Sequence, residues 1–212
     1  MSATFTIDGF IAWLDAFTAR VTEQKAYLTE LDSAIGDADH GSNMARGMAA
    51  VMEKVRSTPA ATADELFKLV GMTLVTSVGG ASGPLYGTFF LLLGMAAGPV
   101  QQCDAATLAT ALRAGLDGVV ARGKAEAGDK TMFDALAPAL DALDAAVASG
   151  ASLAEATAAA SAAAAAGRDA TAPLVARKGR ASYLGERSAG HLDPGATSTA
   201  LLFDALAEVA SA

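Results

Sequence analysis

Leu31-Asp-Ser-Ala-Ile-Gly-Asp-Ala-Asp-His-Gly-Ser-Asn43 places three aspartates, Asp32, Asp37 and Asp39, within eight residues, and no basic residue separates them. Hard divalent ions such as Mg²⁺ are held by carboxylate oxygens and usually keep positions open for substrate phosphates. Gly36 interrupts the stretch and offers a break between two helices. The stretch therefore indicates a helix-loop-helix connection that carries a metal site for phosphate chemistry.

The spacing of the aspartates requires this break. On one continuous helix turning about 100° per residue, Asp32 and Asp39 share a face while Asp37 points away from both. A helix that ends near residue 31, followed by a tight loop at Gly36, would fold all three together. The alternative is that Asp32 closes one helix while Asp37 and Asp39 are turn and N-cap residues for the next. His40 is open to several roles, as a ligand, a base, a nucleotide contact or a structural group. Its role as a metal ligand is disfavoured because Mg²⁺ prefers oxygen.

Composition limits the class of protein. With 212 residues and 52% hydrophobic content, the chain can bury a substantial core, and we expect one domain over residues 1–212. The net charge of -8 argues against a nucleic-acid polymer or an anionic membrane as a partner. The single cysteine, Cys103, excludes an internal disulfide, and the N-terminus lacks the pattern of a secretory signal. The most apolar stretch, 85–100, is shorter than the roughly 20 residues of a membrane helix. We therefore expect a cytoplasmic protein.

An abundance of alanine, leucine and methionine, without sustained alternation, predicts an all-α fold. Start signals stand at Ser42, at Ser82-Gly-Pro84, at Asp129 and at Asp193-Pro-Gly195. Eight helices are predicted, over 7–31, 43–56, 62–78, 84–97, 105–121, 131–148, 152–170 and 194–210.

The connections between these helices are of two alternating kinds. Those after the second, fourth and sixth helices are short and ordinary, whereas those after the first, third, fifth and seventh are rich in glycine and charge. If consecutive helices pack antiparallel, every second connection lies at the same end. We therefore predict an eight-helix antiparallel up-and-down barrel or bundle, with a phosphate site among four loops and four helix N-termini at one end.

Three loops join the aspartate loop at that end. The glycines of residues 79–84, Gly-Gly-Ala-Ser-Gly-Pro, let main-chain amides approach an anion. The Walker phosphate-binding pattern is missing, so a plain turn is the alternative interpretation. Asp129 and Lys130 have two interpretations. Either they cap a helix and place a cation near phosphate, or they form a solvated cap with an exposed lysine. The final loop concentrates positive charge at Arg177, Lys178, Arg180 and Arg187. These side chains either clamp a polyphosphate or form a solvated basic segment.

Five motifs, in order, resemble those of one family: 36–41 (Gly-Asp-Ala-Asp-His-Gly), 79–84, 128–132 (Gly-Asp-Lys-Thr-Met), 179–187 (Gly-Arg-Ala-Ser-Tyr-Leu-Gly-Glu-Arg) and 193–197 (Asp-Pro-Gly-Ala-Thr). The family is the nucleotide-binding L subunit of bacterial dihydroxyacetone kinase, together with the equivalent domain of single-chain kinases. The resemblance implies an eight-helix barrel in which Asp32, Asp37 and Asp39 bind two Mg²⁺ ions. It also implies nucleotide contacts at His40, Gly41, Ser42, Asn43, Ala81, Ser82, Gly123, Met132, Arg180, Asp193, Pro194 and Gly195.

The resemblance further implies an activity that needs a partner. Members of the family transfer a phosphoryl group between ADP or ATP and dihydroxyacetone, which a histidine of a separate K subunit holds covalently. Arg180 and Mg²⁺ would neutralise charge around the moving group. In one branch ADP stays bound and is recharged by a phosphotransferase-system M subunit, and in another ATP exchanges. Ser42, where members vary, does not decide between these branches.

Two other functions stay open at this point. The same pocket would serve a nucleotide-sensing interaction protein that controls a transcription regulator. It would also serve an ATP-dependent kinase subunit for another small ketose or polyol, because substrate choice would lie with the partner. Neither alternative involves direct contact with nucleic acid or with a membrane.

Overall fold

The computed structural model describes residues 4–212, which fold into nine α-helices, one 3₁₀ helix and two very short strands. The all-α prediction is confirmed, since the strands hold two residues each. The elements in chain order are β1 (Phe5–Thr6), α1 (Ile7–Glu23), α2 (Lys25–Ile35), α3 (His40–Ser57), α4 (Ala63–Ser77), α5 (Ser82–Ala97), β2 (Gln102–Cys103), α6 (Ala105–Gly123), α7 (Phe133–Ala148), α8 (Leu153–Ala170), η1 (Arg180–Ser188) and α9 (Pro194–Ser211).

The first predicted helix, 7–31, is wrong in two respects. It divides at Gln24 into α1 and α2, so the count of eight is exceeded. The Gln24 N–H donates to the Arg20 carbonyl at 2.9 Å, and the Gln24 carbonyl accepts the Leu28 N–H at 2.9 Å, so Gln24 ends the hydrogen bonding of α1 and begins that of α2. Helix α2 also continues past the predicted end at residue 31 to Ile35, so Gly36 caps the helix instead of lying inside a loop. Asp32 is therefore a helical residue and not the start of a loop.

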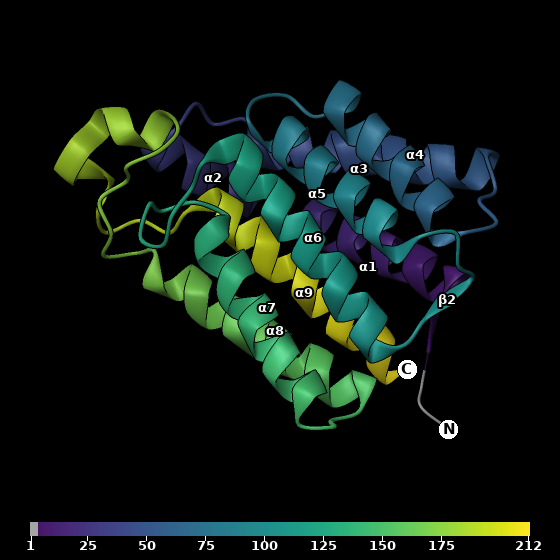
Figure 1. Ribbon diagram of the computed structural model, residues 1–212. Helices are drawn as coiled ribbons and strands as arrows, with labels where there is room; N and C mark the ends of the chain where they lie inside the picture. Colours follow the sequence, from purple (N-terminus) through teal and green to yellow (C-terminus); the bar gives the residue numbers. More distant parts are fainter. Residues whose placement is uncertain (1–3) are drawn as a thin grey trace.

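The helices form a closed ring. Contacts run from α1 to α3, then from each helix to the next as far as α9, and from α9 back to α1. Figure 1 shows these helices side by side, sloping from upper left to lower right, with α2 near the yellow-green η1 at the left. The second predicted helix begins at His40, three residues early, so Ser42 lies in its first turn instead of capping it. The antiparallel arrangement follows the prediction, and it places alternate connections at one end.

Aromatic side chains fill the centre of the ring. The indole of Trp13 is fully buried, and its Nε1–H donates to the Leu202 carbonyl oxygen at 2.8 Å, which joins α1 to α9. Burying such a side chain contributes about 1.5–3 kcal/mol relative to exposure. Helices α4 and α5 approach closely at Gly71, where an added Cβ would stand 2.6 Å from the Gly87 carbonyl oxygen. The largest fully buried aromatic residues are Trp13, Tyr86, Phe10, Phe17, Phe67, Phe89, Phe90 and Phe203.

The end of the ring opposite α2 contains the two strands. Phe5 pairs with Cys103 and Thr6 with Gln102, in antiparallel register. The sequence predicted an ordinary turn over 98–104, whereas part of that link pairs with the start of the chain. Figure 1 shows β2 and the C-terminus together at the right, far from η1.

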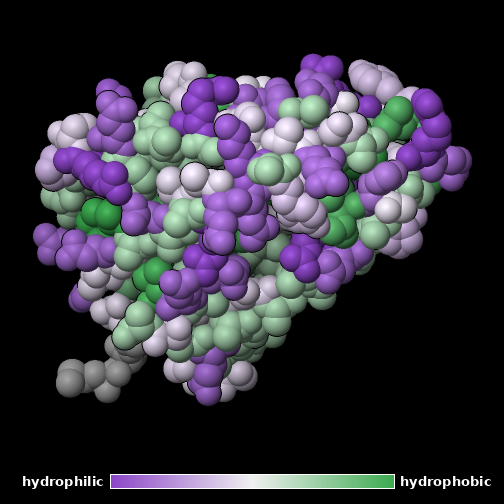
Figure 2. All heavy atoms as spheres, turned by 180° about the vertical axis from the view of Figure 1, so that it is seen from behind, coloured by the Kyte–Doolittle hydropathy of each residue, from purple (hydrophilic) through white to green (hydrophobic). Residues whose placement is uncertain are grey.

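The outer surface is mostly polar or only mildly hydrophobic. Figure 2 shows, on the face opposite that of Figure 1, hydrophilic side chains scattered among pale green ones. Within residues 4–212, no helix is both long enough and apolar enough to span a bilayer. The large hydrophobic residues with substantial exposure are Tyr27, Met72, Val75, Met95 and Tyr183.

Candidate functional site

A cleft of about 590 Å³ lies at the end of the ring where α2 and η1 stand. All four glycine-rich and charged loops line it, so their predicted convergence is confirmed. Residues at or beside the N-termini of α3, α5, α7 and α9 also line it, namely His40, Ser82, Met132 and Pro194. Helix N-termini present free N–H groups and a positive dipole end, so the cleft favours an anion.

Asp32 organises the aspartate loop from the last turns of α2. Its side chain is 8% exposed, and its Oδ2 accepts the backbone N–H groups of Asp39 at 2.8 Å and His40 at 3.0 Å. These two bonds fold the loop back onto the helix and start α3 beside it. Glycine is required at position 36 because an added Cβ would stand 2.1 Å from Asp32 Oδ1. Ala38, in the same loop, adopts a left-handed φ of 61°.

This folding brings the three carboxylates together. Oxygens of Asp32, Asp37 and Asp39 lie within 4.8 Å of one another. Three acidic oxygens at this separation suit a hard cation such as Mg²⁺, and the open side of the cluster faces the cleft. Arg180 of η1 reaches across, and its Nε lies 2.9 Å from Asp37 Oδ2. The donor set therefore fits a divalent metal, with an arginine beside it.

His40 is held by hydroxyl groups on both sides of its ring. Its Nδ1 lies 3.1 Å from Ser82 Oγ, and its Nε2 lies 2.9 Å from Ser198 Oγ. The Ser198 hydroxyl is in turn 2.7 Å from the buried Tyr86 hydroxyl. Burial lowers the pKa of His40, although the negative charges of Asp32 and Asp39 act to raise it. With both ring nitrogens bonded, the structural interpretation of His40 is favoured over that of a metal ligand.

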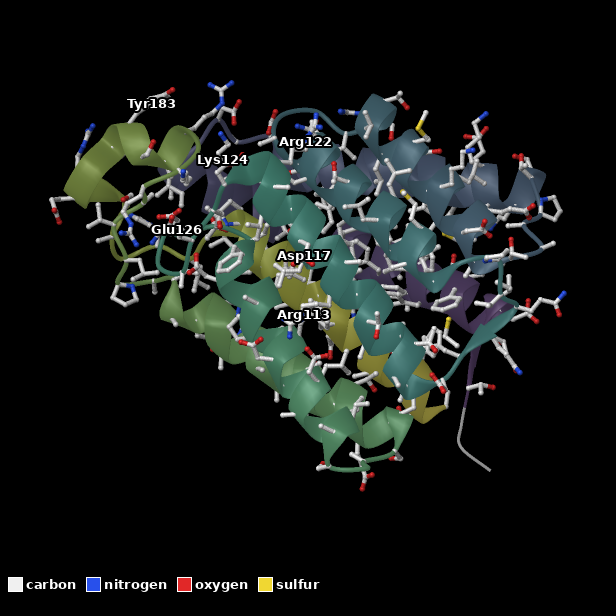
Figure 3. All side chains as sticks on the ribbon, in the orientation of Figure 1. Arg113, Asp117, Arg122, Lys124, Glu126 and Tyr183 are labelled. Carbon is white, nitrogen blue, oxygen red and sulfur yellow. The ribbon has the colours of Figure 1, made fainter. Side chains whose placement is uncertain are left out.

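Apolar side chains also line the cleft, and sequence reasoning missed two of them. Leu85 of α5 and Val119 of α6 were not predicted to lie in the site, whereas Met132 was predicted as a nucleotide contact, and all three line the cleft. In the sequence Leu85 and Val119 look like core residues, because they follow the apolar periodicity of their helices. Arg122, at the end of α6, also lines the cleft, and Figure 3 shows it near Lys124. The cleft therefore offers apolar side chains as well as charged groups to a ligand.

The long basic loop is ordered and covers one side of the cleft, and we call residues 177–193 the flap. Ala181 and Leu184 of η1 pack with Ile35 of α2 and with Ala176. Tyr183 is 86% exposed and projects outward in Figure 3. The flap is therefore held over the aspartate loop by a small apolar cluster and by the Arg180–Asp37 ion pair.

Asp129 and Lys130 are both buried, which contradicts the interpretation as a solvated cap with an exposed lysine. The Asp129 carboxylate accepts the Glu126 N–H at 2.9 Å and pairs with Arg177 at 3.1 Å. The Lys130 ammonium donates to main-chain carbonyls, at 2.7 Å in the case of Thr171. Burial lowers the pKa of Lys130, while the charge of Asp193 opposes that shift. Asp129 does not cap α7, whose N-cap residue is Met132, and Asp134 in the first turn of α7 accepts the Gly128 and Thr131 N–H groups of the preceding loop.

Asp193 caps α9 as predicted, because its Oδ2 accepts the Ala196 N–H at 2.6 Å. Burial raises the pKa of the Asp193 carboxyl to about 7, although the bond from Ala196 acts in the opposite direction. Pro194 and Gly195 follow in the first turn, and an added Cβ on Gly195 would stand 3.4 Å from the Met132 nitrogen. The start of α9 and that of α7 are thus in close contact within the cleft.

Not every predicted nucleotide contact lines the cleft. Gly41 packs against α2, where an added Cβ would stand 2.1 Å from the Lys25 carbonyl oxygen. The Asn43 side chain is buried and accepts a bond from Arg46. Ser42 lines a separate groove beside α2. The predicted residues that do line the cleft are Asp32, Asp37, Asp39, His40, Ala81, Ser82, Gly123, Met132, Arg180, Asp193, Pro194 and Gly195.

Comparison with known proteins shows which family the chain belongs to. The family model described as the DAK2 domain matches residues 34–208. The chain belongs to the DAK2 domain family. This DAK2 chain is 46% identical, over 96% of its length and 98% of the relative's, to the PTS-dependent dihydroxyacetone kinase, ADP-binding subunit DhaL, of Lactococcus lactis. It is 46% identical to the corresponding PEP-dependent subunit of Escherichia coli, over 93% of this chain and 94% of the relative. The resemblance recognised from the motifs is confirmed.

Longer proteins contain a similar region. The crystal structure of the dihydroxyacetone kinase from C. freundii in complex with AMP-PNP and Mg²⁺ matches with a TM-score of 0.72 and 32% identity. That match covers 93% of the DAK2 chain and 33% of the kinase. An L-erythrulose 1-kinase of Mycolicibacterium smegmatis is 36% identical over 93% of this chain and 35% of that enzyme. The DAK2 chain thus corresponds to about a third of these larger kinases.

Proposed function

We propose that this chain is the nucleotide-binding subunit of a dihydroxyacetone kinase and transfers a phosphoryl group between ADP or ATP and dihydroxyacetone held on a separate K subunit. The carrying observation is the cluster of three carboxylates within 4.8 Å, facing helix N-termini and Arg180 in one cleft. The names of the relatives, ADP-binding subunits of dihydroxyacetone kinases, support the nucleotide and the reaction.

The metal would be held by Asp32, Asp37 and Asp39, and we propose two Mg²⁺ ions. When bound, Mg²⁺ supplies positive charge that neutralises the phosphate oxygens and orients them for in-line transfer. The complex of the C. freundii kinase with AMP-PNP and Mg²⁺ supports this choice of metal. Asp32 also keeps its two backbone bonds, so the loop is already formed around the ligands.

The other residues bind and orient the nucleotide. The N-termini of α5 and α9 direct N–H groups toward its phosphates, and Ser82 adds a hydroxyl group. Leu85, Val119 and Met132 offer an apolar surface for the base. Arg180, whose side chain is 69% exposed, can move from Asp37 to the transferring phosphoryl group and stabilise its charge. The flap excludes water from this part of the cleft.

We further propose that the phosphoryl group comes from a phosphotransferase-system M subunit, with ADP kept as a bound cofactor. The words "PTS-dependent" and "PEP-dependent" in the names of the relatives favour this branch. A second candidate is a kinase subunit for another small ketose, which the 36% identity to an L-erythrulose 1-kinase supports. In both cases the partner subunit would select the substrate.

Calorimetric titration of nucleotide-stripped protein with ADP and ATP, in Mg²⁺ and then in EDTA, tests the proposal. We expect tight binding that depends on Mg²⁺. Very slow ADP release would support the permanently bound cofactor, whereas fast exchange would support ATP as a substrate. Absence of binding would reject the kinase. Tight binding without triose phosphorylation, when dihydroxyacetone-loaded K and phosphorylated M subunits are supplied, would favour a nucleotide sensor that acts on a transcription regulator.

A further inference from the structure

Lys130 holds its charge in an unusual environment. The side chain is 1% exposed, and four main-chain carbonyl oxygens surround its ammonium. The distances are 2.7 Å to Thr171, 3.1 Å to Leu174 and 3.3 Å to Ala172, and the fourth partner is His191. An ammonium has three N–H groups and no acceptor, so these four oxygens use all of its bonding capacity. Lys130 therefore acts on the protein and not directly on a phosphate.

The four carbonyls belong to two segments that must meet beside the cleft. Thr171 directly follows α8, where the last carbonyls of a helix lack helical partners. His191 lies at the returning end of the flap, two residues before the cap of α9. The same two segments are joined by the Gly190 N–H, which donates to the Ala172 carbonyl at 2.7 Å, and by the Asp193 N–H, which donates to Thr171 Oγ1 at 3.0 Å. Lys130 thus ties the returning end of the flap to the end of α8.

The neighbouring residue, Asp129, ties the outgoing end of the flap. Its carbonyl accepts the Arg177 N–H at 3.1 Å, and its carboxylate pairs with the Arg177 guanidinium at 3.1 Å. Two adjacent residues therefore hold the two ends of one loop, and that loop carries Arg180. Between these ends, the apolar contacts of the flap are limited to a small cluster around Ile35.

We propose that Lys130 is a positioning residue, an internal cation that clasps the flap and thereby places Arg180 and the start of α9 over the carboxylates. The consequence for catalysis rests on the function proposed above, whereas the consequence for the flap does not. Without the ammonium, four carbonyls would lose a charged donor in a buried place, and a segment with few apolar anchors would open. The helical ring, which has its own aromatic core, would remain folded.

Hydrogen exchange in nucleotide-free protein tests the clasp. We would compare the wild type with Lys130→Ala, Lys130→Met and, as a matched loss of one charge, Lys124→Ala at an exposed site. Both Lys130 variants should exchange roughly ten-fold or more faster over residues 171–193, because this segment loses the charged donor that bonds four of its carbonyls. Exchange in α4 and α5 should not change, and Lys124→Ala should behave as the wild type.

Chemical rescue separates the ammonium from the bulk of the side chain. Propylammonium supplies the three carbons and the nitrogen that Lys130→Ala lacks, and Lys130 lines the cleft, so a small cation can enter. It should restore slow exchange of residues 171–193 in Lys130→Ala. In Lys130→Met, where the stem already occupies the space, it should have no effect.

Two results would overturn the proposal: unchanged exchange over 171–193 in Lys130→Ala, or faster exchange to the same degree in α4 and α5, which would show general destabilisation. ADP titration of the same proteins then reports on the cleft, where we expect roughly ten-fold weaker binding in Lys130→Ala and recovery with propylammonium. If the wild type bound no ADP while the exchange results held, the proposed function would fail and the clasp would stand.

Discussion

Replacing Asp37 by asparagine should separate the metal role of the aspartate loop from its structural role. The substitution removes one charge with little change of size. In the metal-free protein, carboxylates up to 4.8 Å apart repel each other by roughly 0.9 kcal/mol per pair in a medium as polar as water. Losing the exposed ion pair to Arg180 costs about 0.2–1 kcal/mol. The metal-free variant should therefore be as stable as the wild type or slightly more stable.

Nucleotide binding should change in the opposite direction. A carboxylate about 4 Å from one unit of positive charge contributes about 4 kcal/mol at an effective dielectric constant of 20. Because the amide oxygen and water replace part of this interaction, we expect a loss of about 2 kcal/mol, or roughly 30-fold in Kd, with Mg²⁺ present. In EDTA the variant and the wild type should bind ADP equally weakly.

The assay is ADP calorimetry at fixed Mg²⁺, together with urea unfolding of the metal-free proteins. Asp117→Asn is the matched control, because Asp117 is exposed on α6 and lies away from the cleft in Figure 3. Unchanged ADP affinity in Mg²⁺ would refute the metal assignment. A loss of metal-free stability well above 1 kcal/mol would show instead that Asp37 is chiefly structural.

The remaining predictions concern the flap, the packing under α3 and the cap of α9. Arg180→Ala should slow phosphoryl transfer more than it weakens ADP binding, with Arg187→Ala as the control; steady-state kinetics and calorimetry would show this, and a loss of affinity alone would contradict it. Gly41→Ala should destabilise the protein by about 1–3 kcal/mol in thermal unfolding, because its Cβ would press against the Lys25 carbonyl of α2. In EDTA, the unfolding free energy should fall as pH rises from about 4 to about 7. The reason is that the Asp193 carboxyl, with its pKa raised by burial to about 7, binds its proton more tightly when folded. Asp193→Asn retains a cap and should flatten this part of the profile, and an unchanged slope would exclude Asp193 as its source.

Much of the fold could be predicted because its signals are local. Asp193-Pro-Gly195 marks the start of α9 through capping and ring geometry, both of which act within one turn. Gly36 marks the end of α2 for a similar reason. The division at Gln24 carries no such signal, because no glycine or proline stands at or beside it. Its position depends on how α1 and α2 pack against the rest of the ring.

Within the site, residue type predicted the chemistry better than it predicted the hydrogen-bond partners of each side chain. Three aspartates around a glycine required a converging loop, and the structure forms it. His40 and Lys130 were ambiguous, because a histidine or a lysine next to an acidic motif suits both catalysis and structure. Their partners, Ser198 and the Thr171 carbonyl, lie 158 and 41 residues away. Only the packing of distant segments shows that both side chains are already bonded within the protein.

The sequence by itself determined that the chain is helical, that its charged loops alternate with plain ones and that carboxylates gather at the first of them. These properties follow from backbone preferences and from charges close together along the chain. The tertiary structure alone decided that Leu85 and Val119 face a cleft, that Arg180 reaches Asp37 and that Lys130 is enclosed by carbonyls. Each of these depends on which remote groups the closed ring brings within a few ångströms, and burial then sets the strength of their electrostatic interactions.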